Sequence, residues 1–227
     1  MKLVRRRFEP GFLSPTDIMP VVEAALGVVA EAWRQLIAAN KLTSRHRRCE
    51  NLTSAELRYQ MRLVESNRNP RLPPMKIRGE VETFGRRRVV RPSGRVDIEI
   101  IHSLSNENDL HIECKIVSNS QEDRPSGRAT YYVDHGLFRF VAGRYASGLP
   151  WGILLAYVVD GETLGAIERV GRRVAARRGR LRTIRDWARD HRFQGHEFLF
   201  STQHRSGKDR QIDVLHLFLP FRPRQSL

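Results

Sequence analysis

The chain has few cysteines, a shortage of acidic residues and no long hydrophobic run, and each shortage excludes a class of protein. Its two cysteines, Cys49 and Cys114, provide neither a disulfide framework nor a zinc-ligand set, so reduced thiols and a cytoplasmic location are expected. The most apolar early stretch, 18–39, is interrupted by three charged residues, which predicts an amphipathic helix and no membrane span. The glycine-rich phosphate loop of ATPases is absent from the sequence.

The charge balance points to a polyanionic partner. The 227 residues include 40 Lys and Arg against 25 Asp and Glu, which gives a net charge of +15 and an isoelectric point near 11.0. Most of these cations are arginines, whose planar guanidinium suits phosphate. A basic surface binds nucleic acid of any sequence through counterion release. We therefore expect nucleic acid, specifically double-stranded DNA, as the partner.

The arginines are clustered in two segments. Arg172, Arg173, Arg177 and Arg178 lie in a basic stretch, 169–192, that we interpret as a DNA-binding surface on two helices, the second predicted over 181–191. The alternative is a pair of ordinary amphipathic helices whose arginines face solvent. A smaller cluster consists of Arg86, Arg87, Arg88 and Arg95, which directly precede Asp97 and are also interpreted as nucleic-acid-binding.

Two short β-branched apolar runs carry acidic residues and a lysine. Side chains alternate between the faces of a strand, so Glu113 and Lys115 share one face of the run 110–117 while Cys114 points into the core. In the earlier run, 95–101, Asp97 lies on the face opposite Ile98. Fifteen residues separate Asp97 from Glu113, and the polar stretch 103–109 among them supplies a turn. The two runs are therefore predicted to pair as a hairpin.

Residues of these types suit phosphodiester hydrolysis. Carboxylate oxygens are hard ligands, and Mg²⁺ or Mn²⁺ is held by one or two carboxylates while waters and substrate phosphate complete its shell. We expect Asp97 and Glu113 to bind this metal ion, and the ammonium of Lys115 to stabilise hydroxide and the transition-state phosphate. The alternative is a solvated strand face with alternating charges.

The segments Gly94-Arg95-Val96-Asp97 and Ile112-Glu113-Cys114-Lys115 together resemble the PD-(D/E)xK nuclease superfamily, which has the restriction-endonuclease-like fold. The segments 131–145 and 151–158 are similar to the helix and the next core strand in a group of bacterial defence-associated nucleases of that superfamily. The resemblance covers roughly 45–220. The sequence departs from the motif at Val96, which stands where a proline is usual.

The resemblance also implies further metal ligands. The segment 50–57 is similar to a helix that supplies an additional acidic ligand in this superfamily, and this role is carried to Glu50. Glu56 is a second acid of this segment, and Glu80, on an expected strand near Asp97, competes for the role. Glu50 and Glu56 are equally ordinary as first-turn helix acids. The backbone carbonyl of Cys114 is expected to complete the set.

The order of predicted elements gives an α/β fold. The resemblance implies a restriction-endonuclease-like core, with a mixed central β-sheet flanked by helices, over 48–227, and we expect an N-terminal helical extension over 1–47. The main hypothesis is an Mg²⁺-dependent endonuclease of bacterial anti-phage defence. Such compact nucleases work beside a separate sensor, ATPase or other defence protein, and a homodimer is compatible with the sequence. The alternatives are a catalytically idle nucleic-acid-binding subunit on the same fold and an unrelated basic scaffold.

Overall fold

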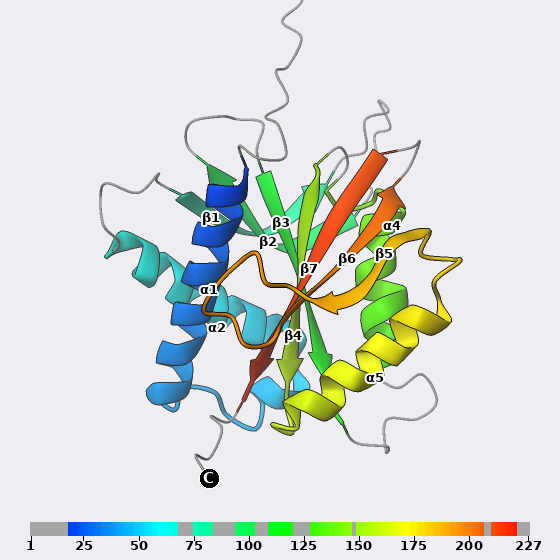
Figure 1. Cartoon of the computed structure of the whole chain (residues 1–227). Coiled ribbons are helices and arrows are strands. Elements are labelled where there is room, and N and C mark those ends of the chain that lie inside the picture. The colour runs from blue at the N-terminus through cyan, green and yellow to red at the C-terminus, as the bar shows by residue number, and fades with distance from the viewer. Residues whose placement is uncertain are drawn as a thin grey trace, which may run out of the picture.

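The computed structural model describes residues 18–67, 75–83, 94–102, 109–119, 128–146, 149–206 and 210–221, which form a central sheet covered by helices on both faces (Figure 1). The sheet has seven strands in the order β1-β2-β3-β4-β7-β6-β5. The strands are β1 (Met75–Thr83), β2 (Gly94–His102), β3 (Asp109–Val117), β4 (Trp151–Val158), β5 (Thr183–Arg189), β6 (Leu199–Ser206) and β7 (Arg210–Pro220). The predicted α/β class with a mixed, helix-flanked sheet is therefore confirmed.

The sheet is antiparallel at its two sides and parallel in the middle. β2 pairs antiparallel with both β1 and β3, as the predicted hairpin requires. β4 lies parallel to β3 on one side and to β7 on the other. β6 pairs antiparallel with β7 and with β5. All eight residues of β4 are buried, which agrees with a central parallel strand covered on both faces.

Two helices cover one face of the sheet. They are α1 (Met19–Ala38) and α2 (Glu50–Ser66), and the short helical turn η1 (His46–Arg48) lies between them in the sequence. Leu57 and Met61 of α2 are fully buried together with Ile98, Ile112 and Cys114. Trp33 of α1 stacks on Tyr157 of β4, with 5.4 Å between ring centroids. α1 therefore belongs to the same hydrophobic core as the sheet, while the predicted domain boundary at 47/48 stays a prediction.

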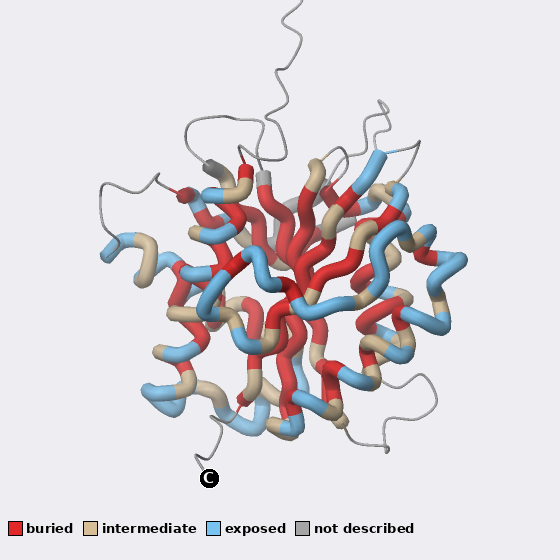
Figure 2. Tube along the Cα trace, viewed as in Figure 1, coloured by how far each residue is buried: buried red, intermediate tan, exposed pale blue. Residues whose placement is uncertain are grey.

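The opposite face is covered by a continuous helical segment and by α5 (Thr163–Ala176). The segment consists of α3 (Arg128–Tyr131), the π-helical turn η2 (Tyr132–Leu137) and α4 (Phe138–Val141). It provides the crossover that the parallel strands β3 and β4 need. Val133, Leu137, Leu154 and Val170 pack in this second core. In Figure 2 the buried residues follow the sheet through the middle of the molecule, between the two helical layers.

The helix predicted over 181–191 is wrong, because this segment forms β5. Gly179 is followed by a turn in which Arg182 has a φ of 49°. β5 then pairs with β6, and Trp187 stacks on Phe200, with 5.2 Å between ring centroids. Trp187 therefore packs against the sheet from an edge strand, where aromatic residues are favoured, while Leu181 is buried just before the strand and Ile184 is exposed.

None of the helices among the described residues combines the length and apolarity that crossing a membrane requires.

A chain of buried hydrogen bonds crosses the second core. The Tyr132 hydroxyl lies 2.9 Å from His216 Nδ1, and His216 Nε2 lies 2.9 Å from Thr202 Oγ1. Thr202 Oγ1 lies 2.7 Å from His204 Nε2, and His204 Nδ1 lies 2.9 Å from the Leu181 carbonyl oxygen. Because a carbonyl only accepts, His204 Nδ1 donates to it, and the neutral ring accepts at Nε2 from Thr202. Burial lowers the pKa of His204 to about 4 and that of His216 well below 6.5.

We expect the contribution of these two histidines to the free energy of unfolding to decrease as the pH falls from 6.5, the ordinary histidine pKa, towards 4. In this window the unfolded chain binds protons at both histidines and the folded chain does not, so the stabilisation is complete above pH 6.5. Each pKa unit of difference corresponds to about 1.4 kcal/mol per group. Denaturant unfolding and imidazole nitrogen shifts measured across this window test the expectation. Protonation of folded His204 at its ordinary pKa would contradict it.

Candidate active site between β2 and β3

The site arises where β2 and β3 separate. Their last paired residues towards this end are Ile98 and Ile112. Beyond them, the backbone N–H of Cys114 donates to Asp97 Oδ2 at 2.7 Å, and the N–H of Ile116 donates to Glu50 Oε2 at 3.2 Å. Alternate N–H groups of a strand point to the same side, so both would otherwise face β2. The carboxylates of Asp97 and Glu50 thus accept the hydrogen bonds that a strand partner would accept. Because both bind neighbouring N–H groups of β3, the two carboxylates lie in the same site.

The ammonium of Lys115 lies at the centre of the site. Its Nζ is 2.7 Å from Glu50 Oε1 and 2.8 Å from Glu113 Oε1, and it donates to the Cys114 carbonyl at 2.6 Å. The Lys115 residue is 3% exposed and Glu113 is 2% exposed, so both polar side chains lie inside the protein. The solvated-face alternative for this strand is therefore wrong, because α3 and η2 cover the face that carries Glu113 and Lys115.

Burial and mutual charge shift the pKa values of the site. Burial, helped by the neighbouring Asp97 charge, raises the pKa of Glu113 to about 8 in spite of Lys115. Burial also raises the pKa of Asp97, more than Lys115 lowers it. Burial disfavours the ammonium of Lys115, but the charges of Glu113, Glu50 and Asp97 outweigh this effect and raise its pKa. Lys115 alone therefore does not compensate for the burial of the Asp97 and Glu113 carboxyl groups.

The Asp97 and Glu113 carboxyl groups fit a hard divalent cation. Glu113 Oε2 is buried and lacks a hydrogen-bond partner among the described residues. An added positive charge beside it would stabilise the ionised form that burial disfavours. Two carboxylates are enough for Mg²⁺, which keeps several waters. Within the described ranges, however, no group of three or more His, Cys, Asp and Glu side chains is arranged to hold a metal ion. Water, substrate phosphate, a backbone carbonyl or a side chain outside the described ranges would supply any further ligand.

The other predicted ligands have different positions. Glu50 lies in the site but accepts from Lys115 and Ile116, and the Cys114 carbonyl accepts from Lys115. Glu56 lies six residues further along α2, which is about 9 Å of helix rise. The Glu80 and Arg95 side chains, and all of Arg86, Arg87 and Arg88, lie outside the described residues. Their predicted roles stay predictions.

Several residues at the site were missed from the sequence. Arg139 Nη1 of α4 lies 3.4 Å from Glu113 Oε1 and also donates to the Tyr145 hydroxyl. Arg58 of α2 donates to the Asp97 carbonyl at 3.1 Å. A Cβ on Gly79 would lie 2.2 Å from the Arg58 guanidinium carbon, so the glycine gives this arginine its path to Asp97. These residues belong to no sequence motif. They lie on separate elements and come together only when the chain folds.

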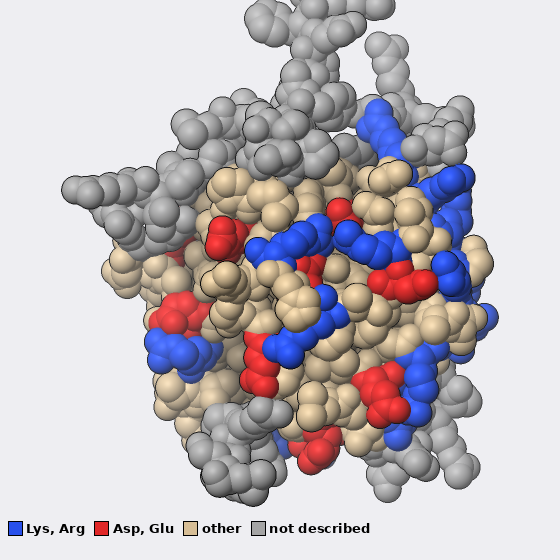
Figure 3. Space-filling view, in the orientation of Figure 1, with Lys and Arg blue, Asp and Glu red and all other residues tan. Residues whose placement is uncertain are grey.

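Most arginines at the end of α5 and in the following turn pair with acidic residues. Arg173, Arg177 and Arg180 converge on Asp134 of η2, with N–O distances of 3.0, 3.7 and 3.3 Å. Three guanidinium groups around one carboxylate leave an excess of positive charge. Figure 3 shows basic side chains mixed with acidic ones on the front face and gathered at its right-hand edge, on the side of α5. The predicted DNA-binding surface is therefore partly structural.

Arg172 and Arg178 are the better probes of that surface. Arg172 pairs with Glu168 at 3.1 Å and Arg178 with Asp186 at 3.1 Å, and both arginine side chains are at least 60% exposed. Exposed pairs of this kind contribute little to stability. Their replacement therefore changes the surface charge with little effect on the fold.

We expect the double substitution Arg172→Gln and Arg178→Gln to weaken duplex DNA binding at low salt and to reduce its salt dependence, because phosphate contacts release counterions. Fluorescence anisotropy over a salt series measures both quantities. Arg34→Gln is the matched control, since Arg34 is 70% exposed and pairs with Glu31 on the opposite helical layer. Equal salt slopes for the double variant and the wild type would exclude these arginines as DNA contacts.

Comparisons of the chain with protein-family models, with curated proteins and with solved structures gave no match.

Proposed function

We propose that this protein is a divalent-metal-dependent nuclease that hydrolyses phosphodiester bonds in DNA, with Asp97, Glu113 and Lys115 as its reacting centre. The observation that carries the proposal is the position of these three side chains at the point where β2 and β3 separate, with Lys115 Nζ 2.8 Å from Glu113 Oε1. Asp97 is 16 positions from Glu113 and 18 from Lys115 in the sequence, and the three side chains form one polar group in which Glu113 and Lys115 are buried. The restriction-endonuclease-like core and a place in bacterial anti-phage defence belong to the same proposal and rest on the sequence resemblance.

The residues of the site divide the chemistry between them. A divalent ion held by Asp97 and Glu113 would supply a Lewis acid and a polarised water. Lys115 would place its ammonium beside the phosphate and stabilise the charge that develops in the transition state. Glu50 and the Cys114 carbonyl hold that ammonium in position. Arg139, which is about one-third exposed, adds a second positive charge on the helical side of the site.

A cleavage assay with the purified chain tests the proposal. Supercoiled plasmid, linear duplex and single-stranded DNA are incubated with Mg²⁺, with Mn²⁺ and with chelator, and with candidate partner proteins in a second series. The proposal expects products only where a divalent ion is present. Absence of divalent-dependent cleavage in every combination would exclude it.

A second candidate is a catalytically idle nucleic-acid-binding subunit, and one observation favours it. Lys115 Nζ lies within hydrogen-bond distance of three oxygens, those of Glu50, Glu113 and Cys114, all of which were predicted as metal ligands. A buried ammonium can thus substitute for a metal ion as the counter-charge of the site. In this reading the arginines bind nucleic acid and the buried charges only stabilise the fold.

A further inference from the structure

A stacked pair of exposed rings lies at the rim of the candidate active site. Tyr131 of α3 and His135 of η2 are four residues apart, so they share one side of the helical segment. Their ring centroids are 4.6 Å apart with an interplanar angle of 27°. Both residues are exposed, and Tyr131 keeps 45% of its surface accessible. An exposed stack of this kind adds nothing to either hydrophobic core.

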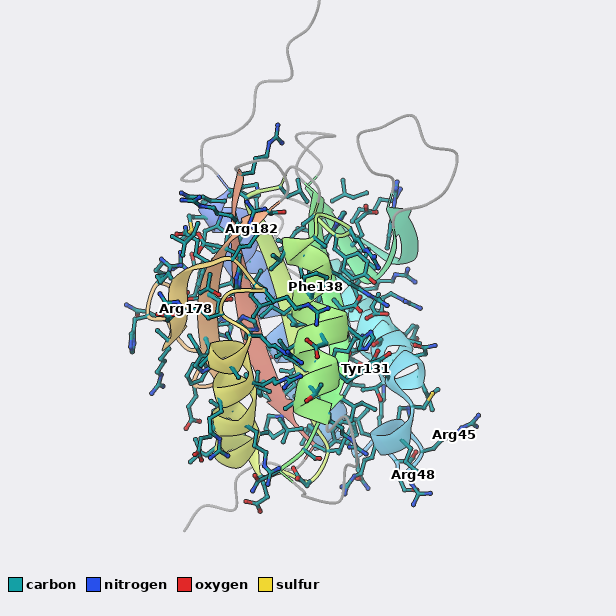
Figure 4. The ribbon with its side chains drawn as sticks, turned by 90° about the vertical axis from the view of Figure 1, so that its right-hand side faces the viewer. Arg45, Arg48, Tyr131, Phe138, Arg178 and Arg182 are labelled. Atoms are coloured by element: carbon teal, nitrogen blue, oxygen red, sulfur yellow. The ribbon has the colours of Figure 1, made fainter. Side chains whose placement is uncertain are left out.

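The rings lie close to the charged centre. The centroid of the Tyr131 ring is 5.7 Å from Lys115 Nζ, the ammonium proposed to face the phosphate. In Figure 4 Tyr131 lies on the central helical segment and faces the viewer, with Arg45 and Arg48 on one side of it and Arg178 and Arg182 on the other. Phe138, further along the same segment, has the Arg180 guanidinium carbon 4.4 Å from its ring centroid. Aromatic and cationic groups therefore alternate across this surface.

Alternating rings and cations are the groups that bind a single strand. Single-stranded nucleic acid binds where a basic surface follows its backbone and aromatic side chains stack on its bases. In a duplex the bases are already stacked on their neighbours, so an exposed ring beside the reacting phosphate gains a partner only from an unpaired base. The duplex expected from the sequence leaves Tyr131 and His135 without a role.

We propose that Tyr131 and His135 form a stacking platform for an unpaired base next to the scissile phosphate, so that the substrate is single-stranded nucleic acid. The proposal rests on the proposed nuclease function for the position of the phosphate. The stack of two rings presents a wider apolar surface than either ring alone, and Lys115 beside it attracts the adjoining phosphate. The platform accepts any base, because every base has a π-face.

The test is a binding cycle in chelator, where no cleavage occurs. Fluorescently labelled oligothymidylate of about 12 nucleotides, within the range of single-strand sites, is compared with an abasic strand of equal length and charge and with a duplex. Tyr131→Ala is expected to weaken oligothymidylate binding by about 5- to 100-fold, the effect of losing one stacked base. Tyr131→Trp is expected to retain binding, His135→Ala to weaken it, and binding of the abasic strand is expected to be unchanged by Tyr131→Ala.

Tyr59→Ala is the matched control, because Tyr59 is 55% exposed on α2 and lies nine residues, or about 13 Å of helix rise, beyond Glu50. The proposal is overturned if Tyr131→Ala leaves oligothymidylate binding unchanged, if it weakens the abasic strand equally, or if the wild type binds none of the three ligands. Cleavage with Mg²⁺ is measured separately. If the protein cleaves DNA but Tyr131→Ala has no effect on binding, only the stacking proposal is contradicted. If Tyr131→Ala weakens binding but no cleavage occurs, only the proposed nuclease function is contradicted.

Discussion

Asp97→Asn is expected to abolish divalent-dependent cleavage, with a loss of at least about 100-fold, because the metal ion contributes several kcal/mol to the transition state. The amide oxygen of the new side chain can still accept the hydrogen bond from the Cys114 N–H, which Asp97 Oδ2 accepts at 2.7 Å in the wild type. The strand geometry should therefore survive while the negative charge is lost. Cleavage rates and Mn²⁺ titration calorimetry measure the two consequences.

Glu113→Gln is expected to have the same effect for the same reason. Glu113 is 2% exposed, and a glutamine of equal size fills its place while removing the ionised form that a cation requires. Glu31→Gln is the matched control for charge removal, since Glu31 pairs with Arg34 on α1, in the helical layer away from the arginine-rich surface. If Asp97→Asn or Glu113→Gln cuts as fast as wild type, the metal-dependent nuclease is the wrong function for this site.

The hairpin could be predicted from the sequence because local patterns determine it. Apolar residues alternate with polar ones in both strands, and the pairing of Ile98 with Ile112 follows from bringing these runs together. The position of Asp97 near Glu113 is a consequence of that register. Glu50 was carried over from a resemblance, and it lies in the site because α2 begins at that residue.

What could not be predicted depends on tertiary contacts. The alternation in β3 shows which side chains share a face, but it does not show that α3 and η2 bury the polar face. β5 has an arginine-rich sequence with apolar residues at spacings of three, which a helix accommodates equally well. Its state is decided by pairing with β6 and by the stacking of Trp187 on Phe200. Arg139 approaches Glu113 across 26 residues, a distance over which periodicity carries no information.

The burial of the charged group constrains its function as well as its stability. A buried ion pair is weak evidence for stability, since its desolvation can cost as much as its attraction returns. Here the Lys115 ammonium is shared among three oxygens, and burial still raises the pKa of the Glu113 carboxyl to about 8. The arrangement is therefore poor as a structural device and suited to receiving another charge. This reasoning favours the nuclease over the idle subunit, and Lys115 allows the two to be separated.

Lys115→Met is expected to reduce cleavage by about 100-fold or more, the effect of removing one preorganised positive group from a transition state. The methionine keeps the apolar stem, which matters because a Cβ on Gly136 would lie only 3.3 Å from Lys115 Cγ and the space is tight. Asp97 and Glu113 remain, so the metal should still bind. Lys41→Met is the matched control, since Lys41 lies outside the site and donates to Gln60 at 3.3 Å.

The same variant gives opposite metal-binding results under the two hypotheses. In a nuclease, wild type and Lys115→Met both bind Mn²⁺, and added metal restores the stability that the variant loses with its counter-charge, because a ligand that binds the folded state stabilises it. In an idle subunit the ammonium takes the place of the metal, so the wild type should bind no Mn²⁺ and only Lys115→Met should acquire a site between Glu50 and Glu113. Calorimetry and thermal unfolding of both proteins, with and without Mn²⁺, distinguish these outcomes. Full cleavage by Lys115→Met would contradict the role proposed for the ammonium, whichever protein binds the metal.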